Sequence, residues 1–99
     1  MKCQLQAETG EVVEEVLDRG GVIDRLIPPV SDDTSACWRF IDPYGDTVFN
    51  TLQMGPFLLE LDVFQRTATE QQALVLARLE SMARRCRDDV HLYLKFIGD

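Results

Sequence analysis

The chain lacks any hydrophobic run near the roughly 20 residues that a membrane-spanning helix requires. Its first residues, Met1 to Gln6, also lack the apolar core of a secretion signal. We therefore expect a cytoplasmic protein that does not associate with a membrane. The three cysteines, Cys3, Cys37 and Cys86, stand far apart and form no C-x-x-C pair, which is typical of reduced thiols rather than of a disulfide framework.

Motifs that bind cofactors or perform catalysis are absent as well. There is no G-x-G-x-x-G or G-K-S/T phosphate-binding sequence, and no G-x-S-x-G turn that would present a nucleophile. The only histidine, His91, and the cysteines lack the short spacing of a structural zinc site. Asp42, Asp46 and Asn50 recur every fourth residue, unlike the alternating ligands of a calcium loop. We expect no cofactor, no metal and no enzymatic activity.

Positive charge is scarce, because 10 lysines and arginines stand against 17 aspartates and glutamates, which leaves a net charge of −7. Residues 1–66 carry all of the excess, since acidic and basic residues balance from Thr67 onward. An acidic surface repels phosphate groups, so the composition argues against binding to nucleic acid. It suits a basic protein partner instead.

The amino-acid composition is typical of a folded protein. Hydrophobic residues make up 45% of the 99 residues and charged residues 27%, which predicts one compact domain, residues 1–99. Apolar and polar residues alternate over residues 2–8 and, most regularly, over 90–97, and this pattern predicts two strands. A similar alternation around Trp38 predicts an interior strand over residues 35–41.

Residues 11–18 allow two interpretations. Their apolar residues have helical spacing, whereas the preceding Thr9-Gly10 turn and their β-branched content favour the return strand of a hairpin. We favour the strand. The helix would leave a three-stranded alternative with an N-terminal helix.

A turn separates the N-terminal elements from the first main helix. Asp42-Pro43-Tyr44-Gly45 has the composition of a type I turn. Asp46 or Thr47 is then placed to cap a helical segment over residues 48–64. Gly55-Pro56 falls inside this segment, which leaves open whether it is one kinked helix or two pieces.

A second helix is predicted over residues 69–87. Thr69 and Gln72 fit a capping box at its start, and Thr67 with Glu70 offers a second register. The spacing of its apolar residues predicts a buried stripe of Leu76, Leu79, Met82, Ala83 and Cys86.

These elements together predict an α+β fold with about four mostly antiparallel strands and two main helices packed on one face. The predicted strands are residues 2–8, 11–18, 35–41 and 90–97, and the helices are residues 48–64 and 69–87.

Two kinds of candidate site remain. Exposed charges and the aromatic residue at the turn are candidates for protein interaction, and they comprise Tyr44, Asp46, Glu14, Glu15, Asp32, Asp33, Arg84, Arg85 and Arg87. A pocket between the sheet and the 48–64 segment is the other candidate, lined by Trp38, Phe49, Phe57, His91 and Tyr93.

No motif identifies a specific function. We expect a small acidic, non-catalytic interaction module, comparable to an inhibitor, immunity protein, antitoxin or adaptor. Its partner would be another protein or a second copy in a homodimer, with no role for nucleic acid or membrane. A domain that binds a small-molecule ligand in the predicted pocket is the alternative.

Overall fold

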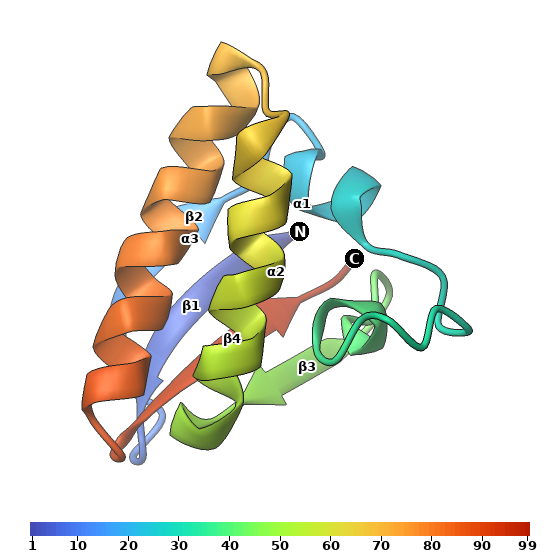
Figure 1. Ribbon diagram of the computed structural model, residues 1–99. Coiled ribbons are helices and arrows are strands. Elements are labelled where there is room, and N and C mark those ends of the chain that lie inside the picture. The colour runs from blue at the N-terminus through green and yellow to red at the C-terminus, as the bar shows by residue number, and fades with distance from the viewer.

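The computed structural model describes all 99 residues. Its elements follow in the order β1 (Lys2–Ala7), β2 (Val12–Leu17), α1 (Val22–Leu26), η1 (Trp38–Phe40), β3 (Asp46–Phe49), η2 (Thr51–Gln53), α2 (Met54–Arg66), α3 (Glu70–Asp88) and β4 (Leu92–Ile97), where η marks a short 3-10 turn (Figure 1). No helix has both the length and the apolar composition needed to cross a membrane.

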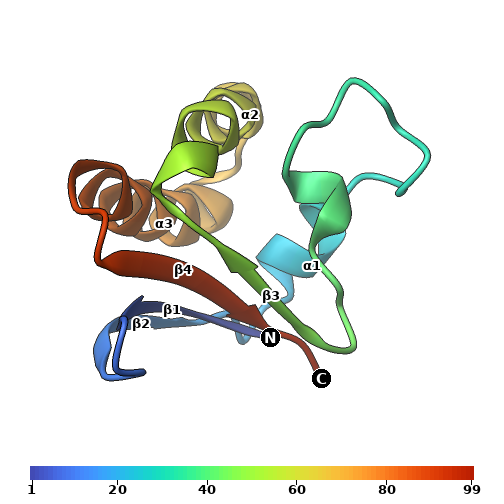
Figure 2. The ribbon, with the colours of Figure 1, turned by 90° about the horizontal axis from the view of Figure 1, so that it is seen from below.

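The four strands form one antiparallel sheet in the order β2-β1-β4-β3. Helices α2 and α3 lie side by side over one face of the sheet, and the other face is open (Figure 2). The predicted α+β fold is therefore confirmed. Strands β1 and β4 form the centre, so that their inward side chains Leu5, Leu94 and Phe96 are fully buried.

The strand interpretation of residues 11–18 is also confirmed, because β1 and β2 form an antiparallel hairpin. Gly10 lies in its turn with a φ of 89°, a conformation that residues with side chains rarely adopt. The register shifts by one after Leu5, which leaves Val13 as an extra residue without a partner on β1. This bulge interrupts the alternation of the strand at Val12 and Val13, which are two of the four apolar residues with helix-like spacing.

The strand predicted over residues 35–41 is wrong. Residues 38–40 form the 3-10 turn η1, and the fourth strand of the sheet is β3 instead. The alternation was misleading because burial does not follow it: Cys37, Trp38 and Ile41 are buried, whereas Phe40 is half exposed.

A carboxylate explains why this segment forms a turn. The side chain of Glu60 on α2 accepts hydrogen bonds from the N–H groups of Cys37 (2.8 Å) and Trp38 (3.4 Å). These N–H groups begin the turn, so the carboxylate satisfies donors that a strand would have paired with a neighbouring strand.

The helix predicted from residue 48 begins later than expected. Val48 pairs with Lys95 of β4, and Phe49 pairs with Leu94, so both residues belong to the sheet. The predicted caps at Asp46 and Thr47 are wrong for the same reason, since these residues lie in β3.

Asn50 starts the helical segment instead. It forms a capping box with Gln53, in which Asn50 Oδ1 accepts a hydrogen bond from the Leu52 N–H at 3.0 Å and the Gln53 side chain accepts one from the Asn50 N–H at 2.9 Å. Helix α2 then runs without interruption from Met54, because Pro56 lies in its first turn, where no N–H is required.

The helix predicted over residues 69–87 is confirmed as α3. Thr69 Oγ1 accepts a hydrogen bond from the Gln72 N–H at 3.2 Å, and the Gln72 side chain accepts one from the Thr69 N–H at 3.0 Å. The predicted stripe is buried throughout, and comprises Leu76, Leu79, Met82, Ala83 and Cys86.

Five aromatic rings fill the space between the sheet and α2. Trp38 stacks on Phe57 with ring centres 5.1 Å apart, and its edge meets Phe64 at 4.8 Å. Phe49 and Phe96 complete the cluster, with their ring centres 5.9 Å apart. The Trp38 indole N–H donates to the carbonyl of Phe57 at 3.4 Å, so its one polar atom is satisfied.

The predicted turn over residues 42–45 is present and holds the end of the chain. The Tyr44 N–H donates to the Asp42 carboxylate at 2.9 Å, as expected for aspartate at the first position. The Gly98 N–H donates to the carbonyl of Gly45 at 2.8 Å. A Cβ on Gly98 would come within 2.5 Å of the Pro43 carbonyl, so this close approach requires glycine.

Candidate interaction site beside helix α2

Two of the charged groups predicted for interaction meet each other within the chain. Arg85 on α3 forms an ion pair with Glu14 on the edge strand β2. Arg78 donates to the carbonyl of Glu15 at 2.7 Å, while the Glu15 side chain accepts a hydrogen bond from Gln4 at 2.6 Å. Two arginines of α3 therefore attach this helix to the edge strand of the sheet.

The other predicted interaction residues lie apart from one another. Arg84 and Arg87 are each paired with an acidic residue of α3, at 2.9 and 3.0 Å. Asp46 lies 3.5 Å from Lys95 on the open face of the sheet. Tyr44 stands at the tip of its turn with 83% of its surface exposed, and Asp33 is exposed in the segment before η1.

The residues predicted to line a pocket do not share one. Trp38, Phe49 and Phe57 are no more than 3% exposed and pack ring to ring, so side chains fill the space between the sheet and α2. Tyr93 lies on the opposite, open face of the sheet. His91 is exposed, with Nδ1 2.9 Å from the carboxylate of Glu8; this hydrogen bond and the charge of Glu8 raise the pKa of His91 above its ordinary value.

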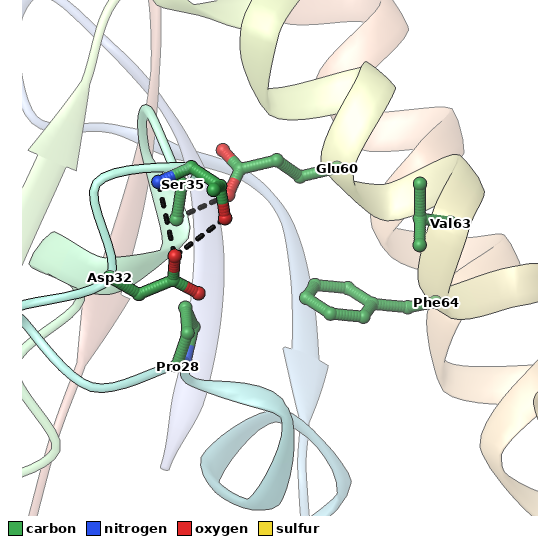
Figure 3. Close-up of a pocket in the computed structure, with 7 residues that line it drawn as sticks. Pro28, Asp32, Ser35, Glu60, Val63 and Phe64 are labelled. Atoms are coloured by element: carbon green, nitrogen blue, oxygen red, sulfur yellow. Dashed lines mark hydrogen bonds between the residues drawn. The ribbon is translucent and has the colours of Figure 1, made fainter.

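A pocket of about 260 Å³ opens instead between α2 and the segment that precedes η1 (Figure 3). This segment lies on the side of α2 that faces away from α3 (Figure 2). We call this cavity the α2 pocket. Its lining residues are Glu60, Val63 and Phe64 from α2 with Pro28, Asp32, Thr34 and Ser35 from the facing segment.

Glu60 joins the two walls of the α2 pocket. Besides its two backbone hydrogen bonds to η1, its carboxylate accepts a hydrogen bond from the hydroxyl of Ser35. Ser35 is 5% exposed, and its oxygen accepts a further hydrogen bond from the Arg39 N–H at 3.0 Å. The floor of the pocket is thus held by a continuous set of hydrogen bonds.

Asp32 places a second carboxylate at the pocket. It accepts hydrogen bonds from the hydroxyl of Thr34 and from its N–H at 3.0 Å. These hydrogen bonds lower the pKa of Asp32, and the charge of Arg39 adds to the effect, so that the group is ionised at neutral pH. No lysine, arginine or histidine lines the pocket, whose walls therefore carry two carboxylates and no cation.

A second, neighbouring pocket of about 410 Å³ shares Pro28 with the first. Its lining is mostly apolar and comprises Ile27, Pro28, Val30, Arg39, Phe40, Ile41, Asp42 and Pro43. Arg39 donates to the carbonyl of Val30 at 3.2 Å, and its guanidinium lies 4.6 Å from the centre of the Phe40 ring. Arg39, whose charge also acts on Asp32, is therefore held by residues of this second pocket.

The cysteines are free and buried, and their chemistry is suppressed. Burial raises the pKa of Cys3 well above its ordinary value, and it raises those of Cys37 and Cys86 to about 11. A thiol with such a pKa is a poor nucleophile at neutral pH. No three histidine, cysteine, aspartate or glutamate side chains gather in a way that could hold a metal ion.

Asp32 is the one residue of the α2 pocket that the sequence predicts as a candidate for interaction. Glu60 escapes prediction because its partners are more than 20 positions away along the chain, and no local pattern connects them. A comparison of the chain with protein-family models, with curated proteins and with solved structures finds no match in any of the three.

Proposed function

We propose that the chain is a non-catalytic interaction module that binds a protein partner by accepting one of its basic side chains in the α2 pocket. The observation that carries this proposal is the pair of carboxylates, Asp32 and Glu60, set in walls that contain no cation. A lysine or arginine combines an apolar stem with a charged head. Val63 and Phe64 are placed to contact the stem while the carboxylates pair with the head.

The size of the pocket supports a side chain as its occupant. Small-molecule sites usually span ~300–1,000 Å³, and the α2 pocket measures about 260 Å³. The predicted small-molecule pocket lies between the sheet and α2, in a space that the aromatic rings occupy. The net charge of −7 further favours encounter with a basic protein, and it makes that encounter sensitive to salt.

The non-catalytic part of the proposal has its own support. The thiol pKa values are raised, which disfavours a cysteine nucleophile. The one histidine is exposed beside Glu8, at the end of the sheet, and it lines neither pocket. A base without a nearby nucleophile or enclosed site offers little to catalysis.

The test uses a minimal basic ligand, acetyl-Gly-Arg-Gly-amide, followed through the amide NMR shifts of residues 32–35 and 60–64. We expect a dissociation constant in the ~millimolar range, as for a single side chain, that weakens with added salt. The corresponding glutamine tripeptide should bind at least about tenfold more weakly, because it lacks the charge.

Matched variants locate the binding. Asp32→Asn removes the charge and keeps an oxygen that can accept from the Thr34 N–H, so we expect weaker binding with an intact fold. Asp33→Asn removes the same charge one residue away, outside the pocket, and should have little effect. Equal weakening by both variants, or shifts confined to residues elsewhere, would contradict the proposal.

A further inference from the structure

An apolar stripe runs along the outward face of α2 and the turn that leads into it. Its members are Leu52 from the turn η2 and Pro56, Leu59 and Val63 from α2, where a spacing of three and four residues keeps the last three on one side of the helix. Leu52, Leu59 and Val63 are 84%, 73% and 55% exposed, and Pro56 is exposed as well. The chain leaves most of this stripe uncovered, and the stripe borders the α2 pocket at Val63.

We propose that the stripe is the contact surface of a homodimer in which α2 packs antiparallel against α2 of a second copy. A two-fold interface must be complementary to itself. The four-three-four spacing reads the same in both directions, so a two-fold axis between Pro56 and Leu59 satisfies this condition. Pro56 then meets Leu59 of the second copy, and Leu52 meets Val63 of the second copy.

The charged residues beside the stripe are compatible with a second copy of the chain as its partner. The same axis sets Asp62 opposite Gln53 of the second copy and Glu60 opposite Gly55 of the second copy, so no acidic residue faces another. Within the chain, Asp62 is paired with Arg66 at 2.8 Å. A second copy therefore fits the stripe better than a basic partner does.

The area of the stripe sets the strength of the dimer. From their exposed fractions, the four side chains present on the order of 400 Å² of surface per copy, so that with polar flanks a pair buries roughly 1,000 Å², the low end for specific interfaces. We therefore expect a dimer that dissociates in the ~micromolar to ~millimolar range rather than an obligate one.

Analytical ultracentrifugation of the whole chain from about 5 to 500 µM tests the proposal. The wild-type chain should show a concentration-dependent dimer that strengthens from about 50 to 300 mM salt, because the contact is apolar and salt screens the repulsion between two acidic copies. Leu59→Glu should raise the dissociation constant about tenfold or more. Leu74→Glu on α3 is the matched control, since Leu74 is also 73% exposed, and it should leave the dimer unchanged.

Two results would overturn the inference: a monomer over the whole concentration range, or equal effects of the Leu59 and Leu74 substitutions. Because both positions are exposed, far-ultraviolet circular dichroism should show an unchanged fold in each variant. The proposed dimer and the proposed site for a basic side chain can be refuted independently of each other. Asp32→Asn should weaken the arginine peptide without affecting the dimer, whereas salt should strengthen the dimer and weaken the peptide.

Discussion

Glu60 is the residue whose loss tests most directly how the fold and the α2 pocket depend on each other. Its carboxylate accepts hydrogen bonds from Ser35, Cys37 and Trp38, and Cys37 is only 3% exposed. Replacing Glu60 by Ala removes these bonds and leaves a buried N–H without an acceptor. A hydrogen bond to a charged group contributes ~1.5–3 kcal/mol, and a buried unsatisfied donor costs ~1–3 kcal/mol. Because these effects overlap, we expect a total loss of about 2–4 kcal/mol.

The assay is urea and thermal unfolding followed by the fluorescence of Trp38, the only tryptophan, which is fully buried in the native chain. For a domain of this size the expected loss lowers the melting temperature by roughly 10–25 °C. Asp62→Ala is the control, because this acid on the same helix is exposed and pairs only with exposed Arg66; it should cost less than about 1 kcal/mol. If Glu60→Ala were as stable as this control, the carboxylate would not be what holds η1 in place.

Two further predictions concern the ends of the sheet. Gly98→Ala places a Cβ within 2.5 Å of the Pro43 carbonyl and must break the backbone hydrogen bonds from Gly98 and Asp99 to the turn, at 2.8 and 2.9 Å. The free energy of unfolding, measured by thermal unfolding, should fall by ~1–2 kcal/mol. An unchanged melting temperature would refute the close approach. Glu8→Gln should lower the pKa of His91 toward its ordinary value in an NMR titration, because the hydrogen bond and charge of Glu8 raise it. Since the folded pKa is raised, the stability from this contact is complete below the ordinary histidine pKa and disappears as the pH rises through the folded value; identical titrations of both proteins would exclude the contact.

The strands and helices that depend on a local sequence pattern could be predicted from the sequence. The strand predicted over residues 90–97 is present as β4, although it begins at Leu92 and Val90 is exposed; its inward and outward residues alternate, and alternation is a property of neighbouring residues only. The start of α3 is specified by Thr69 and Gln72, which satisfy each other's backbone N–H groups within one turn. In both cases tertiary packing agrees with the local preference and does not have to override it.

The segment from Trp38 to Phe49 could not be predicted because its structure depends on distant partners. Trp38 lies in a turn rather than a strand since Glu60, 22 residues further on, supplies an acceptor for its N–H. Phe49 lies in a strand rather than a helix since Leu94 pairs with it from the far end of the chain. Neither partner leaves a trace in the local pattern, which by itself favours the opposite assignment in each place.

The candidate site likewise contains one residue that the sequence could predict and one that it could not. Asp32 could be chosen as an interaction residue because it belongs to an acidic, polar run that reads as exposed. Its companion Glu60 sits on a helix among apolar residues, where an acid usually marks only the solvated side. The two walls of the α2 pocket are brought together by the reversal of the chain between residues 28 and 64, and no sequence motif predicts this reversal.

Helix α2 nevertheless carries a signal in its composition that points to association. Only four of its 13 residues are charged or amide-bearing, Glu60, Asp62, Gln65 and Arg66. A helix covered on one side needs a single apolar stripe, which Met54, Phe57 and Leu61 already supply toward the sheet. The second stripe, with Leu59 and Val63, is only partly covered by this chain's own packing, because both side chains are more than half exposed. The longer helix α3 has no such second stripe. The cover that α2 lacks within one chain is what the antiparallel pairing of two copies would provide.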